Sequence, residues 1–383
     1  MSCKEIFELI DGLQESYYNV WEDVVNFESP SNDKERVDQV GDYIANLAEE
    51  RGWLVERCKQ EISGDAICIT MNPDSPLQPV SISGHIDTVH PVGMFGTPAA
   101  RRDDDKIYGP GATDCKGGVI AGLLAMEALH KSGFTKRPVK LLLQTDEEVN
   151  SSQSNKQTIH YICEKAKDSI VFLNLESHAR GYTTLVRKGI ASYRFEVEGK
   201  ESHSSRCVTE GANAIIDAAY KMIEIDKLKD DEGITCNCGV VNGGSVVNTI
   251  PGKCVFAVNF RYATKEQYEW IETFVKELAD TVHVPGCKCR VEQTEMRVAM
   301  ELEERNLRIL EKVNEIFEES ELPRLESRTV RGGSDGADVS TYGIPCLDSL
   351  GTVGGGSHSI NEYAELSSLA EAAKRIAAIV YCI

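Results

Sequence analysis

The sequence predicts an α/β fold of two domains, in which a mixed sheet with helices on both faces is interrupted by a smaller α+β domain. The chain has 383 residues, more than the roughly 250–300 at which a single hydrophobic core stops growing. Strand-like and helix-like segments alternate in its first and last parts. The middle part instead shows two-fold alternation, which is typical of a sheet with one open face.

The first part predicts two helices and four short strands. Pro30 to Trp53 carries apolar residues at helical spacing and has Gly52 as a stop. Val119–Leu129 is a second amphipathic helix that ends before Gly133. The predicted strands are Ala66–Thr70, Val80–Ser83, Val139–Gln144 and Ile170–Leu175.

After about Leu185 the pattern predicts a separate antiparallel sheet with two helices. Tyr193, Phe195 and Val197 alternate with polar residues, and the segment 254–260 does the same. One helix lies around 212–228, and Thr264 opens the other with Gln267 as its capping-box partner. The expected order is strand, helix, two strands, helix, strand.

Beyond about Met296 strands and helices again alternate. A strand is predicted at Ile344–Leu350, and a last helix begins near Ser368, with Glu371 as its partner in a capping box. We therefore expect one domain of residues 1–185 and 297–383, with residues 186–296 inserted into it.

The composition excludes two classes of partner. Lys and Arg number 41 and Asp and Glu 61, so the formal net charge is −20, which repels phosphate backbones and anionic lipid headgroups. No segment has the ~18 consecutive apolar residues of a membrane span, and we expect a cytoplasmic protein without nucleic-acid or membrane partners.

Thirteen cysteines, an odd number, favour reduced thiols over a disulfide framework. Two Cys-x-Cys pairs, Cys236/Cys238 and Cys287/Cys289, allow a four-thiolate zinc site. Because each pair lies in an alternating run, where residues i and i+2 share one sheet face, we favour sheet packing over metal binding.

Polar side chains that suit a metal follow three of the predicted strands. His85, the pair Glu147-Glu148 and Glu176 each come just after a strand. In open α/β sheets the carboxyl ends of the strands are where ligands bind. Asp114 precedes a helix and His358 follows the strand Ile344–Leu350. Each residue alone has an ordinary structural explanation, but together these side chains are able to meet at one point.

Charge supports a metal at that point. Adjacent glutamates at a buried sheet end repel each other unless cations neutralise them. Two dications balance the negative charges of Asp114, Glu148, Glu176 and a bridging hydroxide when both histidines are neutral.

Six motifs together resemble the co-catalytic zinc metallopeptidase family of glutamate carboxypeptidase, acetylornithine deacetylase and succinyl-diaminopimelate desuccinylase. They occur in one order over nearly the whole chain: Gly-His85-Ile-Asp87-Thr-Val, Gly-Pro-Gly-Ala-Thr-Asp114-Cys-Lys-Gly-Gly, Thr-Asp-Glu147-Glu148, Glu176, Gly-Gly-Ser334-Asp335-Gly and His358-Ser-Ile-Asn-Glu362. The resemblance implies a zinc-exopeptidase-like catalytic domain with an inserted ferredoxin-like lid and dimerisation domain.

The resemblance also assigns roles. It implies that His85, Asp114, Glu148, Glu176 and His358 hold two zinc ions, with cobalt or manganese as possible substitutes, and that Asp114 bridges them. Asp87 would accept the second N–H of His85 and fix its tautomer. Glu147 would be the general base. The peptide bond Asp114-Cys115 would be cis, and Cys115 would be either an inert small residue or an alternative thiolate.

In the inserted domain, His203 matches a histidine that reaches across a dimer to stabilise an oxyanion. Asn248 matches a substrate-contacting loop, and Arg261 is a candidate clamp for a substrate carboxylate. Relatives carry Asp two residues before that arginine, whereas Asn259 stands here. Ser334 is a further candidate for substrate binding.

These residues predict metal-dependent hydrolysis of an amide bond next to a free carboxylate, because Glu176 goes with carboxypeptidases and deacylases in the family. A short peptide or N-acyl amino acid would be held by Arg261 or Arg331, in a homodimer formed through the inserted domain. The alternatives are an aminopeptidase or dipeptidase of the same family, and a metal-binding homologue without activity, which would lack Glu147 or Asp87. A nucleotide-binding enzyme is disfavoured, since Asp114 stands where the dinucleotide fingerprint needs glycine.

Overall fold

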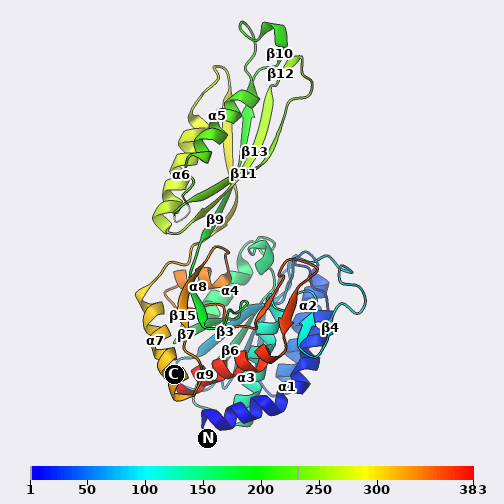
Figure 1. Cartoon of the computed structure of the whole chain (residues 1–383), viewed down its shortest axis with the longest axis vertical. Coiled ribbons are helices and arrows are strands. Elements are labelled where there is room, and N and C mark those ends of the chain that lie inside the picture. Colours follow the sequence, from blue (N-terminus) through cyan, green and yellow to red (C-terminus); the bar gives the residue numbers. More distant parts are fainter. Residues whose placement is uncertain (1, 231–232) are drawn as a thin grey trace. The chain divides into compact units, whose positions relative to one another are not determined.

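The computed structural model describes residues 2–230 and 233–383, which form two units (Figure 1). Unit 1 consists of Met1–Leu185, Leu302–Thr329 and Ser334–Ile383, and unit 2 of Val186–Glu301 and Val330–Gly333. The second boundary thus lies at 301/302, where the sequence places it at 296/297. The reason is backbone pairing beyond the last long strand, because Met300 exchanges two hydrogen bonds of 3.0 Å with Arg187.

Unit 1 contains a six-stranded mixed sheet. Its strand order is β1 (Leu54–Cys58), β2 (Ala66–Met71), β6 (Val139–Gln144), β3 (Val80–His85), β7 (Val171–Asn174) and β16 (Cys346–Leu347). The pairs β6–β3, β3–β7 and β7–β16 are parallel, while β1–β2 and β2–β6 are antiparallel. Four carboxyl ends of strands therefore meet at one edge, as the sequence predicts.

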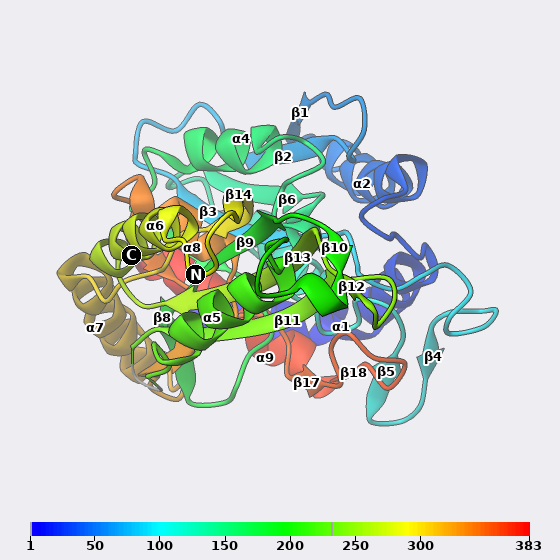
Figure 2. The same ribbon diagram turned by 90° about the horizontal axis from the view of Figure 1, so that it is seen from above.

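Helices cover both faces of this sheet. One face shares a core with α1 (Cys3–Asn26), α2 (Lys34–Glu49), α3 (Lys116–Lys131), α7 (Glu304–Glu319) and α9 (Ser367–Cys382). On the other face α4 (Gln157–Ala166) packs on β2 and β6, and α8 (Asp335–Thr341) on β7 and β16. Figure 2 shows α4 and α9 on opposite sides of the strands. The predicted fold class is confirmed.

Short strands frame the rest of unit 1. A four-stranded sheet has the order β17 (Gly354–Gly355), β18 (Tyr363–Glu365), β5 (Lys106–Tyr108) and β4 (Arg101–Arg102). β8 (Tyr182–Arg187) pairs with β15 (Glu326–Val330), and a single 3-10 turn, η1, spans Glu147–Val149.

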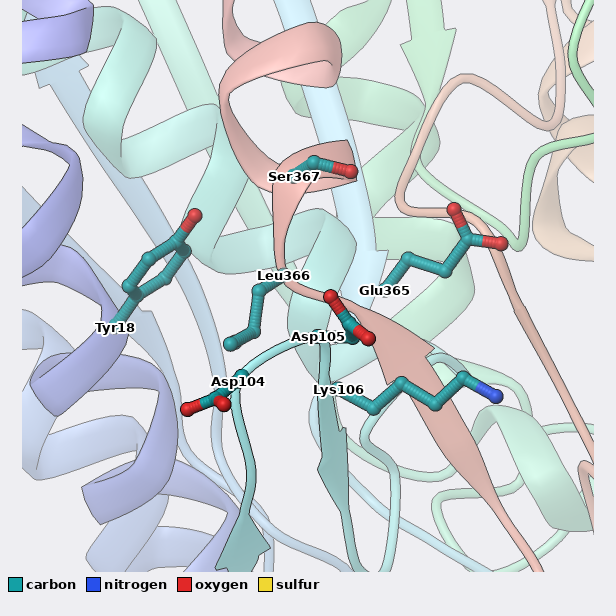
Figure 3. Close-up of a pocket in the computed structure, with 7 residues that line it drawn as sticks. All are labelled: Tyr18, Asp104, Asp105, Lys106, Glu365, Leu366 and Ser367. Atoms are coloured by element: carbon teal, nitrogen blue, oxygen red, sulfur yellow. The ribbon is translucent and has the colours of Figure 1, made fainter.

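A hollow of about 370 Å³ lies between α1, the β4–β5 turn and the start of α9 (Figure 3). Tyr18, Asp104, Asp105, Lys106, Glu365, Leu366 and Ser367 line it. Two of its charged residues have partners outside it, because Glu365 is paired with Arg180 and the Lys106 ammonium lies 4.2 Å from the centre of the Tyr363 ring. None of the predicted site residues lines it.

Unit 2 has a four-stranded antiparallel sheet in the order β11 (Thr235–Gly243), β13 (Lys253–Tyr262), β9 (Gly189–Glu198) and β14 (Lys288–Arg297). The helices α5 (Ala214–Asp226) and α6 (Lys265–Asp280) share its core. Burial alternates along β13, as the two-fold sequence pattern predicts. The short pair β10 (Ser202–His203) and β12 (Thr249–Ile250), together with the turn η2 (Ser204–Arg206), was not predicted.

The two predicted capping boxes differ in outcome. The Thr264 hydroxyl accepts the backbone N–H of Gln267 and caps α6, which confirms the predicted helix start. The box at the last helix is wrong, since α9 begins after Leu366 without a side-chain cap and Glu371 instead pairs with Arg180.

No helix in the described part of the chain is both long enough and apolar enough to cross a membrane. The thirteen cysteines are free thiols. Among the described residues, the groups of side chains close enough to share a metal ion do not include either of the two Cys-x-Cys pairs.

Candidate metal centre

The carboxyl edge of the unit 1 sheet positions the predicted ligands. His85 is the last residue of β3, Glu148 lies in η1 directly after β6, and Glu176 follows β7. Asp114 stands at the start of α3 in a cis peptide bond with Cys115, as predicted. α3 approaches β7 closely, because a side chain on Gly118 would meet the Leu175 carbonyl oxygen at 2.1 Å.

The other four predicted ligands, His85, Glu148, Glu176 and His358, lie around Asp114. Its Oδ1 lies 3.1 Å from His85 Nε2, and its Oδ2 lies 3.3 Å from His358 Nε2. Glu148 Oε2 is 3.1 Å from the same His358 nitrogen, and Glu176 Oε1 is 3.8 Å from His85 Nε2. The donors therefore form two sets, one around each imidazole, that share the two oxygens of one carboxylate.

This arrangement suits two tetrahedral cations. Zinc bonds to histidine nitrogen and carboxylate oxygen are about 2.0–2.1 Å long, so neighbouring donors of one tetrahedral ion lie roughly 3.3 Å apart. The four distances above, from 3.1 to 3.8 Å, match that spacing. Imidazole and carboxylate are donors that suit zinc, and manganese accepts them as well. Asp114 is the carboxylate that would be shared if two ions were bound, because each of its oxygens faces a different imidazole.

The electrostatics of the centre favour cations. Burial, together with the charges of Asp114 and Glu147, raises the pKa of Glu148 to about 7. Hydrogen bonds to Asp114 and Glu148 raise the pKa of His358 to about 11. The Glu148 shift comes first from burial and then from the neighbouring carboxylates, and the His358 shift comes from the two carboxylates that its ring contacts. The surplus of negative charge is what a pair of dications neutralises.

The second N–H of His85 is bonded by the backbone carbonyl of Asp87, whereas the expected acceptor was the Asp87 carboxylate. His85 Nδ1–H donates to the backbone carbonyl of Asp87 at 3.0 Å, while the nearer carboxylate oxygen lies 3.5 Å away. The tautomer of His85 is thus fixed by the main chain of Asp87, which leaves Nε2 to face Asp114.

The fully buried Asp87 carboxylate holds the neighbouring turn instead. Its two oxygens accept the backbone N–H groups of Glu147 and Glu148, each at 3.2 Å, and the Ser31 hydroxyl at 2.6 Å. These bonds fix η1, and with it the position of both glutamates relative to His85. Glu147 is buried there and lies near enough to Glu148 to influence its charge.

A buried support behind Asp114 was missed by the sequence reasoning. Glu362 Oε1 accepts the backbone N–H groups of Thr113 and Asp114, each at 3.1 Å, and Oε2 lies 2.8 Å from His90 Nε2. The charge of Glu362 also faces the fully buried amine of Lys116, which has no hydrogen-bond partner among the described residues. Glu362 stood at the end of the His358 motif, but nothing in the local sequence marked it as buried.

In unit 2, His203 and Asn248 are neighbours. The Asn248 carbonyl accepts the backbone N–H of Ser204 at 2.9 Å, and β10 pairs His203 with Thr249. The ring of His203 is exposed, and its Nδ1 accepts the backbone N–H of Ser205 at 3.3 Å. Because Nδ1 is an acceptor, the ring proton sits on Nε2, which makes Nε2–H an available donor.

Asn259, which stands where relatives carry aspartate, orients the side chain of Arg261. Its Oδ1 accepts Nε–H of Arg261 at 3.2 Å, while its amide donates to the Ser192 hydroxyl at 2.9 Å. The amide oxygen therefore orients the guanidinium without neutralising it.

Ser334 lies away from any surface. Its fully buried hydroxyl caps α8 by accepting the backbone N–H of Gly336 and also bonds to the Asp348 carboxylate. The serine hydroxyl predicted for substrate binding thus serves the packing of α8 on the end of the sheet.

Comparison with known proteins decides the family. Residues 81–381 match the description Peptidase family M20/M25/M40. The chain belongs to this family. It is 27% identical to carboxypeptidase G2 of Pseudomonas sp. (strain RS-16) over 372 residues, which cover 95% of this chain and 88% of the relative. It is 24% identical to succinyl-diaminopimelate desuccinylase of Rickettsia massiliae (strain Mtu5) over 381 residues, covering 92% and 96%.

Solved structures show the M20 fold over almost the whole chain. Aminopeptidase PepT of Bacillus cereus ATCC 10987 superposes with a TM-score of 0.79 at 19% identity, covering 96% of this chain and 98% of that one. A dinuclear metal-binding M20 peptidase of Bacillus subtilis, the YXEP protein, gives 0.71 at 12% identity, covering 97% and 98%. The M20 member described here is a metallohydrolase of the peptidase family.

Proposed function

We propose that this M20 member hydrolyses amide bonds next to a free carboxylate, either releasing a C-terminal amino acid or removing an acyl group from an N-acyl amino acid. The proposal includes two zinc ions, held by His85, Asp114 and Glu176 on one side and by His358, Asp114 and Glu148 on the other. The observation that carries it is the Asp114 carboxylate, whose two oxygens contact two different imidazoles within 3.3 Å.

When bound, a zinc pair supplies Lewis acidity, which lowers the pKa of water and polarises a carbonyl. The residues of the chain position the reacting groups and transfer the proton. Glu147 is buried next to Glu148, and the Asp87 carboxylate holds its backbone in place. The Glu147 carboxylate accepts a proton from the attacking water and donates that proton to the leaving amine nitrogen. Amide and water thus become a carboxylic acid and an amine, which exchange a proton to give a carboxylate and an ammonium group at neutral pH.

Arg261 is the proposed clamp for the substrate carboxylate. Its bond to Asn259 uses Nε–H, so the two terminal nitrogens of the fork remain to bind a carboxylate in the bidentate geometry. Burial lowers the pKa of Arg261, but a guanidinium stays charged at neutral pH. A carboxylate partner recovers the desolvation cost of that charge.

We further propose that the chain forms a homodimer through unit 2 and that His203 acts on the substrate bound by the partner copy. β11 is an edge strand of its sheet and packs against α5, and both elements carry exposed apolar side chains, which together we call the patch. The patch consists of Ile216, Tyr220, Ile223, Val240 and Val241. Exposed edges and apolar patches are features of association surfaces.

Sedimentation velocity tests the dimer. Val241→Lys places a charge on the edge strand and should shift the protein to a monomer at micromolar concentration. Trp270→Lys is the matched control, because this residue is 47% exposed on α6, which packs on β14 at the opposite edge of the sheet. A monomeric wild type, or a dimer unchanged by Val241→Lys, contradicts the proposed interface.

A substrate panel tests the reaction. N-acetyl, N-succinyl and glutamyl amino acids and dipeptides, each with its C-terminal amide as the matched control, are assayed with zinc, cobalt and manganese. We expect turnover of the free acids, its loss after chelation, and its recovery on adding metal. Preference for peptides with a free amino terminus and no discrimination against the amides would favour an aminopeptidase instead.

Glu147→Ala separates chemistry from metal binding. The variant should keep about two metal ions per chain, measured by plasma mass spectrometry, and lose roughly 10²–10⁴-fold in kcat. Turnover like that of the wild type would remove Glu147 from the general-base role, and a metal-free wild type that turns over would reject the whole proposal.

A further inference from the structure

Two cysteines from the first and the last helix of the structure lie in contact. Cys3 is the first residue of α1 and Cys382 the last residue of α9, and their Sγ atoms are 3.3 Å apart. Figure 1 shows the start of α1 near the end of α9. A disulfide needs the two sulfurs about 2.05 Å apart, so the sulfurs must approach each other by about 1.3 Å to bond.

The surroundings make one of the two sulfurs a nucleophile. Hydrogen bonds from Cys382 and from the Ser320 side chain lower the pKa of Cys3 to about 6, against the opposing effect of burial. Cys3 also occupies the first turn of α1, where the backbone N–H groups stabilise an anion. The contact with Cys3 in turn raises the pKa of Cys382. The two shifts have opposite directions, so Cys3 is the sulfur of the pair that loses its proton more readily.

The pair is open to reagents. Cys382 is exposed and Cys3 is half-buried, whereas seven of the other cysteines are buried. In the mechanism proposed above neither residue takes part, and both lie in unit 1 at the ends of helices that pack on each other and on α3.

We propose that Cys3 and Cys382 are a redox modification site, at which a low-molecular-weight disulfide such as oxidised glutathione forms a reversible intrachain disulfide that joins α1 to α9.

The exchange balances without any other reagent. The Cys3 thiolate attacks one sulfur of oxidised glutathione, whose S–S bond breaks and releases one glutathione thiolate. The Cys382 thiol loses its proton and attacks the Cys3 sulfur of the mixed disulfide, which releases the second glutathione thiolate. Two protein thiols are oxidised to one disulfide, one glutathione disulfide is reduced to two thiols, and the protons released by the protein pass to glutathione.

With the Cys3–Cys382 disulfide formed, the layer of helices α1, α3 and α9 should be stiffer than in the reduced protein. α1 and α9 flank α3, and α3 begins two residues after Asp114. A bond between the outer helices closes a loop of nearly the whole chain, and long closed loops restrict the unfolded state most.

The full chain, incubated in glutathione redox buffers, tests the proposal. After alkylation, peptide mapping without reductant should show the Cys3 peptide joined to the Cys382 peptide, and a thiol titration under denaturing conditions should find two fewer than the thirteen of the reduced protein. The melting temperature of the oxidised protein should rise by several degrees and return on reduction.

Single variants give the controls. Cys3→Ser and Cys382→Ser should each abolish the cross-link and the shift in melting temperature, while Cys207→Ser, at an exposed cysteine of unit 2, should change neither. In Cys382→Ser the first step is trapped, so glutathione should accumulate on Cys3 faster than it accumulates on Cys382 in Cys3→Ser. Absence of the cross-linked peptide, stable glutathione adducts on both cysteines of the wild type, or a link between two chains would each overturn the proposal.

Discussion

Replacing Glu362 by glutamine should weaken both the fold of unit 1 and its metal centre. The carboxylate accepts two backbone N–H groups next to the bridging ligand, accepts Nε2–H of His90, and faces the buried amine of Lys116. In Glu362→Gln the new side chain would keep an amide oxygen for the backbone donors but would turn an NH₂ group toward the His90 ring. The variant therefore changes charge and one hydrogen bond while it preserves shape.

The size of the effect follows from these contacts. Two hydrogen bonds to a charged acceptor become neutral, at about 1 kcal/mol each, and the bond to His90 is lost, at about 1.5–3 kcal/mol. Lys116 also loses the nearby charge of Glu362, but burial already lowers the pKa of Lys116 to about 7, so this loss adds little at neutral pH. Because these contacts share one carboxylate, their costs are not additive, and we expect the free energy of unfolding of unit 1 to fall by about 3–5 kcal/mol. Metal affinity should fall about 10–100-fold, the usual cost of losing a group that orients a ligand.

Urea unfolding followed by tryptophan fluorescence measures the first quantity. Trp21 is fully buried in α1 and donates its indole N–H to the Ala112 carbonyl, so it reports directly on the loop that Glu362 holds. Glu365→Gln is the matched control, because that carboxylate pairs with exposed Arg180 and should contribute less than about 1 kcal/mol. Equal unfolding midpoints for the two variants, with equal metal affinity, would refute the role given to Glu362.

Three further predictions concern catalysis. Asp87→Ala leaves two backbone N–H groups of the 147–148 turn without an acceptor, at a cost of about 2–4 kcal/mol, and kcat should fall about 30–1000-fold. Ser31→Ala removes only one donor to Asp87 and should lower kcat about tenfold or less. Equal losses of kcat in the two variants would contradict the role of Asp87. Mixing inactive His203→Ala and Glu147→Ala chains should restore part of the activity if His203 acts across a dimer, and no recovery from proven heterodimers would count against this. Arg261→Lys should raise KM for carboxylate substrates more than for their amides, and an equal rise for both would reject the clamp.

The sequence predicted the metal centre better than it predicted the support of that centre. His85, Glu148 and Glu176 were placed by one rule, that polar residues after parallel strands meet at one sheet edge, and the structure brings them within reach of Asp114. This rule depends only on the parallel direction of the strands, which the alternation of strands and helices along the chain predicts. It needs no knowledge of loop conformation.

The supporting contacts depend on loops that meet only in the folded chain. Glu362 and His90 are 272 positions apart, and neither neighbourhood indicates that the other will cover it. Ser334 was assigned to substrate on its motif, but the turn before α8 buries the hydroxyl against Asp348. Glu371 stood at capping-box spacing from Ser368 and was drawn instead to Arg180, a residue nearly two hundred positions earlier in the chain.

The reciprocal backbone bonds between Arg187 and Met300 have a consequence for how this protein is able to change. They bring the two ends of the insertion to within the Cα separation of an ordinary antiparallel pair, about 5.5 Å. A two-residue hairpin turn spans that gap. Residues 188–299 are therefore replaceable by a short turn or by another inserted domain. Such a replacement would change the part of the chain that is proposed to contact substrate and would leave the six-stranded sheet and the candidate metal ligands continuous.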